Sequence, residues 1–224
     1  MAADDSTREW YDRAVERVPE AAWRRAGALW FVLAIAYRVR QNGWSTEPIV
    51  WLETAIPAAI LYAYLTRTPP ARPARGFAAV VLPFAAAGLP FLLLRPRFTD
   101  WGAAHLQLFG LLLAVPTLWM LASYAVLRRS YALMAEARGL VTRGPYALMR
   151  HPVYVAQALC GAVVLAFRFS WISVAVYVAF LLAQHARLGA EERALAEAHG
   201  KAWEDYAARV GRFGPRLTSS PRSG

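Results

Sequence analysis

Apolar residues in this chain form six runs that are separated by short polar segments. The runs cover residues 26–39, 49–65, 77–94, 105–127, 153–167 and 171–186. The hydrocarbon core of a bilayer is about 30 Å thick and a helix rises about 1.5 Å per residue, so the second to fourth runs can cross it, whereas the others are short. The pattern predicts an all-α polytopic transmembrane helical bundle of about five to six membrane helices, in which short runs thin the bilayer or form a shallow hairpin.

The polar segments divide the chain into four predicted parts. These are an N-terminal interfacial segment (1–25), transmembrane helices one to four (26–127), a region with the last helical hairpin and a cytoplasmic helical segment (128–217), and a disordered tail (218–224). In the first part, Trp10, Tyr11, Val15 and Val18 recur at roughly helical spacing among charged residues. This spacing favours an amphipathic helix in the headgroup layer, with a frayed polar tail as the alternative.

Composition and charge support a membrane protein. Hydrophobic residues make up 58% of the 224 residues and nine are Trp, which is too apolar for a soluble domain. The net charge is +10, yet 24 of the 25 basic residues are Arg in short clusters, which favours membrane lipids over nucleic acid as the partner. With both termini inside, 20 of these 25 residues lie in cytoplasmic segments, as the positive-inside rule requires. The Ala- and Arg-rich composition indicates a bacterial plasma membrane.

A turn and a helix start precede the fifth run. Gly144-Pro145 is a turn signal, and His151 precedes Pro152, a residue suited to the first position of a helix. The free N–H groups of that helix would face a space lined by Tyr146 and His151. Because such a terminus favours a carboxylate or phosphate, the segment predicts an anion pocket at the membrane face.

Charged residues follow the sixth run. Arg187 and Glu191 are four residues apart and share one helix face, with Glu192 turned aside by about 100 degrees. A surface ion pair is the simplest interpretation. The alternative is a ligand site, in which Glu191 holds a cationic or hydroxyl-bearing group and Arg187 an anionic one. Ionisable residues beside lipid are costly, which favours a common site with His151 on the cytoplasmic side.

The ordered set of these motifs resembles the isoprenylcysteine carboxyl methyltransferase family and its phospholipid methyltransferase relatives. The matching blocks are residues 139–146, 150–154, 191–192, 200–206 and 213–215. They span about a third of the chain, whereas the first four runs agree only in being hydrophobic. The resemblance implies an integral membrane enzyme that uses S-adenosyl-L-methionine without a Rossmann domain.

The resemblance also assigns roles to single positions. The implied cofactor-binding residues are Leu140, Val141, Tyr146, His151, Pro152, Val153, Tyr154 and Glu191. Arg187 stands where the family has an arginine implicated in handling the acceptor, and Arg187 and His151 are the catalytic candidates. No metal is expected, since His151 and His185 fit no strong metal-ligand motif.

The implied reaction is methyl transfer to a lipophilic acceptor, either prenylated or lipid-like, with O-methylation of a carboxylate or hydroxyl favoured. A carboxylate needs no base, whereas a protonated acceptor could give its proton to His151 or Glu191. Ala156 stands where the family often has Gly, and Trp203 where it often has Tyr. These departures bear on the acceptor rather than on the implied cofactor ligands.

Two other classes of function stay open. One is an NADPH-dependent membrane reductase of the steroid reductase type, which has a similar layout around Pro152 and Tyr154 but usually an acidic residue where Gln157 stands. The other is a non-catalytic membrane protein that retains the fold, for which a closed or filled pocket is expected. Binding of S-adenosylmethionine separates both from a methyltransferase.

Overall fold

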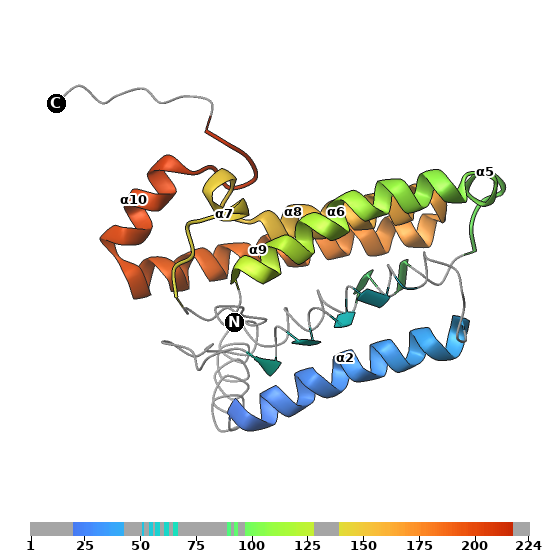
Figure 1. Ribbon diagram of the computed structural model, residues 1–224, viewed down its shortest axis with the longest axis horizontal. Coiled ribbons are helices and arrows are strands. Elements are labelled where there is room, and N and C mark those ends of the chain that lie inside the picture. The colour runs from blue at the N-terminus through green and yellow to red at the C-terminus, as the bar shows by residue number, and fades with distance from the viewer. Residues whose placement is uncertain are drawn as a thin grey trace, which may run out of the picture.

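Helices make up nearly all the regular structure of this chain. The computed structural model describes residues 20–42, 97–127 and 139–216, with scattered residues between 51 and 66 and between 89 and 93. Its helices are α2 (Glu20–Asn42), α5 (Asp100–Ala104), α6 (Leu106–Leu127), α7 (Pro145–Leu148), α8 (Pro152–Phe167), α9 (Trp171–His199) and α10 (Lys201–Arg209) (Figure 1). The described residues contain no strand, only an isolated bridge between Val210 and Pro215. The predicted all-α class is confirmed.

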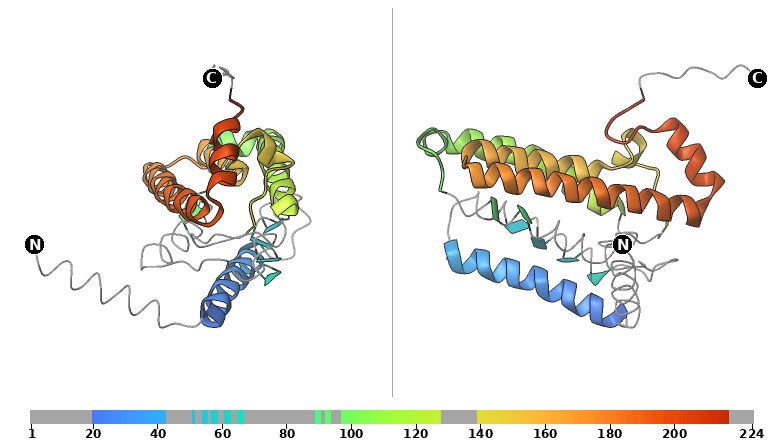
Figure 2. Two further views of the ribbon diagram at one scale, coloured as in Figure 1. Left: turned by 90° about the vertical axis from the view of Figure 1, so that its left-hand side faces the viewer. Right: turned by 180° about the vertical axis from the view of Figure 1, so that it is seen from behind.

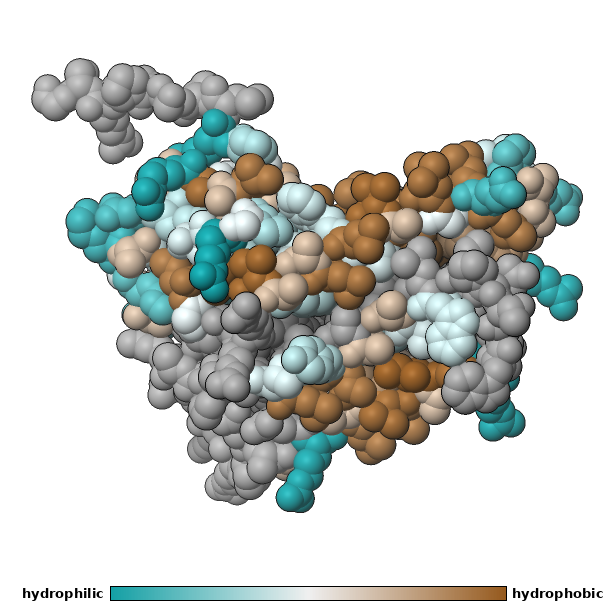
Figure 3. Space-filling view, viewed as in Figure 1, coloured by the Kyte–Doolittle hydropathy of each residue, from teal (hydrophilic) through white to brown (hydrophobic). Residues whose placement is uncertain are grey.

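Two of the described helices, α6 and α9, are long and apolar enough to cross a membrane. The 16 residues of α8 make a shorter apolar helix, which agrees with the short fifth run. Apolar side chains such as Leu111, Val115 and Leu182 point outward from these helices, and brown apolar surface covers much of this region (Figure 3). The five to six spans predicted from the sequence stay a prediction, because the second and third runs lie largely outside the described residues.

The first apolar run belongs to a helix that begins before it. Helix α2 starts at Glu20 and continues through Asn42, so residues 20–25 are continuous with the run instead of forming a separate element. Residues 1–19 of the predicted interfacial segment and the predicted tail lie outside the described residues. Figures 1 and 2 show α2 running along one side of the protein, apart from the group of α6, α8 and α9.

The core of that group lies where α5 and α6 meet α8. Phe109 and Leu113 of α6 are buried with Val164 and Phe167 of α8 in one apolar cluster. The ring centroids of Phe109 and Phe167 lie 5.1 Å apart, within the range of favourable aromatic pairs. Cys160 is buried in the same cluster as a small core residue. This packing fixes α8, and with it the residues at its N-terminal end.

A series of hydrogen-bonded polar side chains links α6, α8 and α9 within the apolar bundle. Gln184 of α9 donates a hydrogen bond to Gln157 Oε1 of α8 at 2.5 Å. Gln157 in turn donates to the Tyr124 hydroxyl of α6 at 3.4 Å. A polar group inside an apolar bundle is costly unless it is hydrogen-bonded, so this chain of contacts fixes how α6, α8 and α9 are rotated against one another.

Gly161 of α8 lies against the Tyr177 ring of α9. A Cβ at position 161 would come within 2.7 Å of Tyr177 Cε2, closer than non-bonded carbons approach. We expect Gly161→Ala to separate the helices and to lower the free energy of unfolding in detergent by about 1–3 kcal/mol.

The matched control is Gly189→Ala on α9, where a Cβ would meet only Arg193 Nη1 at 3.6 Å. Removing a glycine from that helix should raise the free energy of unfolding by about 0.5–1 kcal/mol. Thermal melting in one detergent compares the two variants. A Gly161→Ala protein that melts at or above the wild-type temperature would contradict the close helix approach.

Candidate functional site

The turn before α8 has the conformation that its sequence predicts. Gly144 has a φ of 60° and precedes the single turn of α7, which starts with Pro145. This left-handed conformation favours glycine, since a Cβ is strained there. His151 is the N-cap residue of α8 and Pro152 opens the helix. The chain therefore enters α8 through Pro152, which lacks an N–H, while the His151 N–H donates to the Arg212 carbonyl outside the helix.

The first turn of α8 meets the charged turns of α9. The Tyr154 hydroxyl donates a hydrogen bond to Glu191 Oε2 at 2.5 Å. The Arg187 guanidinium lies 5.2 Å from the centroid of the Tyr154 ring, a cation–π distance. Both partners of Tyr154 come from the part of α9 that follows the apolar run 171–186. Tyr154 thus joins an acidic and a basic side chain where the start of α8 meets the part of α9 that follows its apolar run.

Glu192 is the centre of a cluster of charged side chains. Its Oε1 accepts a hydrogen bond from His151 Nε2 at 3.1 Å and lies 3.2 Å from Arg150 Nη1. Arg212 Nη2 donates to Glu192 Oε2 at 2.5 Å, and Arg212 Nε donates to Oε1 at 3.2 Å. Burial raises the pKa of Glu192, but the hydrogen bonds from His151 and Arg212 and the charge of Arg150 outweigh it and lower the pKa from 4.5 to about 2. The carboxylate is therefore ionised and neutralised by its neighbours.

The C-terminal segment closes this end of the protein through the backbone. The Arg150 N–H donates to the Gly211 carbonyl at 2.9 Å, and the His151 N–H donates to the Arg212 carbonyl at 3.1 Å. The Phe213 ring centroid lies 6.5 Å from that of His151. Residues 210–216, which we call the C-terminal strap, thus lie directly against the start of α8.

Helix α10 supports the other side of the site. Gly200 has a φ of 49° where α9 ends and α10 begins, so the chain turns there and α10 folds back toward α7. The Tyr206 hydroxyl donates to the Tyr146 carbonyl at 2.7 Å. Burial raises the pKa of Tyr206 to about 12, which keeps this hydroxyl a donor at ordinary pH. The Arg150 guanidinium lies 5.5 Å from the centroid of the Trp203 ring.

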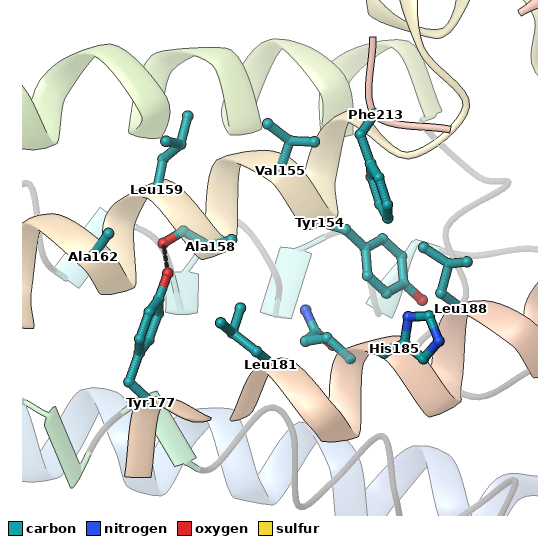
Figure 4. Close-up of a pocket in the computed structure, with 11 residues that line it drawn as sticks. Tyr154, Val155, Ala158, Leu159, Ala162, Tyr177, Leu181, His185, Leu188 and Phe213 are labelled. Carbon is teal, nitrogen blue, oxygen red and sulfur yellow. Dashed lines mark hydrogen bonds between the residues drawn. The ribbon is translucent and has the colours of Figure 1, made fainter. Parts of the chain in front are cut away.

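A pocket of about 340 Å³ opens between α8 and α9 beside these contacts (Figure 4). Tyr154, His185, Leu188 and Phe213 lie at one end of it in Figure 4, next to the charged turns of α9. The other lining residues are Val155, Ala158, Leu159, Ala162, Tyr177, Leu181 and Gln184. Most of this lining is apolar, and the pocket volume is within the range of small-molecule sites. A non-catalytic protein that retains the fold is expected to have a closed or filled pocket, and this open pocket differs from that expectation.

Residues 98–202 match the model of the phospholipid methyltransferase family. This part of the chain is therefore similar to that family. The match starts just before α5 and ends within α10, so it includes α8, α9 and both glutamates of the site. It indicates a membrane methyltransferase. The comparison with curated proteins found no match.

In this phospholipid methyltransferase region, the structure brings several of the predicted site residues together. Tyr154 contacts Glu191 and Arg187 directly, and the His151 and Tyr154 ring centroids are 5.4 Å apart. Pro152 and Val153 form the first turn of α8. Their roles in the reaction stay predictions, because contacts within the protein do not show what a side chain binds.

The remaining predicted residues lie to the side of this centre. Tyr146 is buried on α7, and its carbonyl accepts a hydrogen bond from Tyr206 of α10. Leu140 and Val141 are half-buried in the non-helical segment that leads to α7, and their predicted place at the cofactor is a prediction that no contact tests. Among the described residues, no three His, Cys, Asp or Glu side chains gather as a metal site would need.

Sequence reasoning missed two members of the site. Glu192 was expected to turn away from the face of Glu191, yet it is the buried partner of three basic side chains. The adjacent pair Glu191-Glu192 could have predicted this role, because neighbouring residues on a helix point to different faces and can serve two separate sites. Arg212 lies outside the family match, and nothing in the local sequence pairs it with a residue 20 positions earlier.

Proposed function

We propose that this protein is an S-adenosylmethionine-dependent membrane methyltransferase that acts on a lipophilic acceptor. The observation that carries the proposal is the contact of Tyr154 with Glu191 at the end of an apolar pocket, inside the region that matches the family. This contact joins a polar site at Glu191, suited to the cofactor, to an apolar pocket that is suited to the chain of a lipid acceptor. A reaction between a water-soluble cofactor and a lipid needs both sites side by side.

The side chains around Glu191 suit the groups of S-adenosylmethionine, which carries an ammonium, a carboxylate, ribose hydroxyls and a sulfonium. Among the described residues only Tyr154 hydrogen-bonds Glu191, so one carboxylate oxygen is left to accept from an ammonium or a hydroxyl. Glu192 is already neutralised by its neighbours and is the poorer ligand. The N-terminal end of α8, where the helix dipole is positive, suits a carboxylate.

When bound, the cofactor would supply a methyl group that is activated for displacement by its sulfonium. The residues of the chain bind and orient the reactants and keep water out, which are the main contributions to such a displacement. We assign Arg187 to the acceptor, because its guanidinium lies over the ring of Tyr154, which lines the pocket. His151 is 3% exposed and donates to Glu192, so we assign it to positioning the side chains of the site. We assign Tyr146, Leu140 and Val141 to the walls of the cofactor site.

The pocket between α8 and α9 is proposed to hold the chain of the acceptor, a prenyl or lipid-like group whose carboxylate or hydroxyl is O-methylated. Its apolar lining matches such a chain. The excess of Arg in the segments that flank the site favours a cytoplasmic position for the site and for both termini, in a bacterial plasma membrane.

Equilibrium binding tests this proposal. Radiolabelled S-adenosylmethionine is titrated onto the intact, detergent-solubilised protein, with S-adenosylhomocysteine as competitor and ATP as a control that shares only the adenosine. We expect saturable binding that S-adenosylhomocysteine displaces and ATP does not. Absence of binding, or oxidation of NADPH in the presence of unsaturated lipids, would overturn the proposal, the latter in favour of a reductase.

A further inference from the structure

The polar side chains of the pocket differ in whether they are already engaged. The Tyr154 hydroxyl donates to Glu191, the Tyr177 hydroxyl donates to the Ala158 carbonyl at 2.8 Å, and the Gln184 amide nitrogen donates to Gln157. The buried Gln184 Oε1 has no hydrogen-bond partner, but an amide oxygen is too weak a base to take a proton. His185 is the remaining polar residue of the lining. It is exposed, and no described residue hydrogen-bonds its ring. The pocket therefore offers one imidazole that is open to a ligand.

Figure 4 shows His185 on α9 next to Leu188, at the end of the pocket where Tyr154 and Phe213 lie. This is the end that borders Glu191. An acceptor with its chain in the pocket would carry its reacting group here, beside the proposed cofactor site. The groups around His185 are Tyr154 from α8, the apolar Phe213 from the C-terminal strap, and Arg187 and Glu191 farther along α9, both of which contact Tyr154.

We propose that His185 accepts a proton from the acceptor during methyl transfer, and that the acceptor is a lipid with a neutral hydroxyl group of phenol-like acidity. This inference rests on the proposed function and deepens it, because it selects a hydroxyl over a carboxylate and names the base.

The charge of the lining supports a neutral acceptor. No Arg, Lys, Asp or Glu is among the described residues that line the pocket. A carboxylate or an ammonium inside the pocket would have no charged partner among the lining residues, and an unpaired charge in an apolar site is costly. Arg187, which we assign to orienting the acceptor, is outside the lining and already lies over the Tyr154 ring. A neutral hydroxyl costs far less to bury. It needs only one acceptor for its proton, and the His185 ring can provide that acceptor.

The proposed step balances as follows in atoms and charge. A bond forms between the acceptor oxygen and the methyl carbon, and the bond from that carbon to sulfur breaks, with its electron pair going to sulfur. The O–H bond of the acceptor breaks and its proton moves to the free nitrogen of His185. Because His185 is exposed, the imidazolium can then release the proton to water. The other imidazole of the site, His151, is buried against Glu192 and is badly placed for this exchange.

The test compares His185→Gln with His105→Gln in the full-length protein. His105 is an exposed histidine at the α5 end of the bundle, where its Nδ1 lies 2.8 Å from the Trp101 carbonyl, and serves as the control. Transfer of labelled methyl from S-adenosylmethionine is measured with para-dodecylphenol and with lauric acid in the same micelles. General bases contribute about 10²- to 10⁴-fold, so we expect His185→Gln to slow methylation of the phenol by about 100-fold and His105→Gln to leave it unchanged.

Two further readouts separate a base from a structural residue. The rate of the wild type with the phenol should depend on pH, because a base must be unprotonated to accept a proton, and His185→Gln should lose this dependence. Without any cofactor, para-dodecylphenol should shift the NMR signal of one of the four histidine rings, the one missing from His185→Gln, whereas dodecylbenzene should not.

The outcomes distinguish this inference from the proposed function. Equal phenol methylation by the wild type and His185→Gln at every pH would overturn the role of His185, and so would methylation of lauric acid alone or of neither probe. In these cases saturable binding of S-adenosylmethionine would leave the proposed function standing. A wild type that binds no S-adenosylmethionine would overturn both.

Discussion

Replacing Glu191 by Gln is expected to weaken the binding of S-adenosylmethionine by roughly 30-fold. The substitution keeps the size of the side chain but removes the charge that the proposed ammonium or hydroxyl ligand would contact. Hydrogen bonds to charged groups contribute about 2 kcal/mol, and each 1.4 kcal/mol corresponds to about a tenfold change in affinity. Equilibrium binding to the solubilised protein measures the effect.

Two further variants test whether the loss of affinity in Glu191→Gln is specific to the charge of Glu191. Tyr154→Phe removes the hydroxyl that donates to Glu191 at 2.5 Å while keeping the acid, so we expect a smaller loss of about 3- to 10-fold. Glu204→Gln, at an exposed position on α10, should leave the affinity unchanged. If Glu191→Gln binds S-adenosylmethionine as tightly as Glu204→Gln does, Glu191 is not a cofactor ligand.

The second large effect is expected at Glu192. Its carboxylate is almost buried, with 11% of the side chain exposed, and it neutralises Arg150 and Arg212 and accepts a hydrogen bond from His151. Glu192→Gln leaves these basic groups together without their counter-charge, which costs several kcal/mol for buried pairs. Because half of the Arg212 side chain is exposed, we expect a loss of about 3 kcal/mol in the free energy of unfolding. Thermal and denaturant unfolding in one detergent measures it.

The pH dependence gives an independent check on Glu192. The pKa of its carboxyl is about 2 in the folded protein and 4.5 without these contacts. A group whose pKa is lowered on folding stabilises the folded state above the higher value and loses this contribution as pH falls to the lower one. The wild type should therefore lose its advantage over Glu192→Gln between pH 4.5 and about 2.

The control for both measurements is an acid in an exposed ion pair. Asp205 Oδ1 lies 3.3 Å from Lys201 Nζ, and both side chains are largely exposed. Since exposed pairs contribute about 0–1 kcal/mol, Asp205→Asn should leave the unfolding free energy nearly unchanged at neutral pH. A Glu192→Gln protein as stable as Asp205→Asn would show that the cluster around Glu192 does not stabilise the fold.

Local sequence signals predicted the start of the site correctly. The Gly144-Pro145 turn, the His151 cap and the Pro152 helix start each depend on the backbone preferences of one or two residues. The long apolar run after Trp171 likewise predicted α9. Such features need no knowledge of distant parts of the chain. Together with the distribution of Arg, they were enough to predict that the start of α8 and the end of the apolar run lie on the same side of the membrane.

The contacts that complete the site depend on parts of the chain that meet only in the folded protein. Helical periodicity could not tell which of Glu191 and Glu192 would face Tyr154, because both positions border the same turn of α9. The pairing of Gln184 with Gln157 depends on how α8 and α9 are rotated. Arg212 follows a turn at Gly200 and a whole further helix, so its partner is set by the fold and by no local pattern.

The backbone bonds from Arg150 and His151 to Gly211 and Arg212 set an order for biosynthesis. A chain grows from its N-terminus, and the long apolar helices leave the ribosome before the residues that pair with the start of α8. Newly inserted α8 and α9 therefore lack the strap until translation has passed Arg212. On our proposed topology and function, the strap docks onto the start of α8 after α8 and α9 have been inserted. A nascent chain that stalls before Arg212 would then lack the backbone contacts that complete the site.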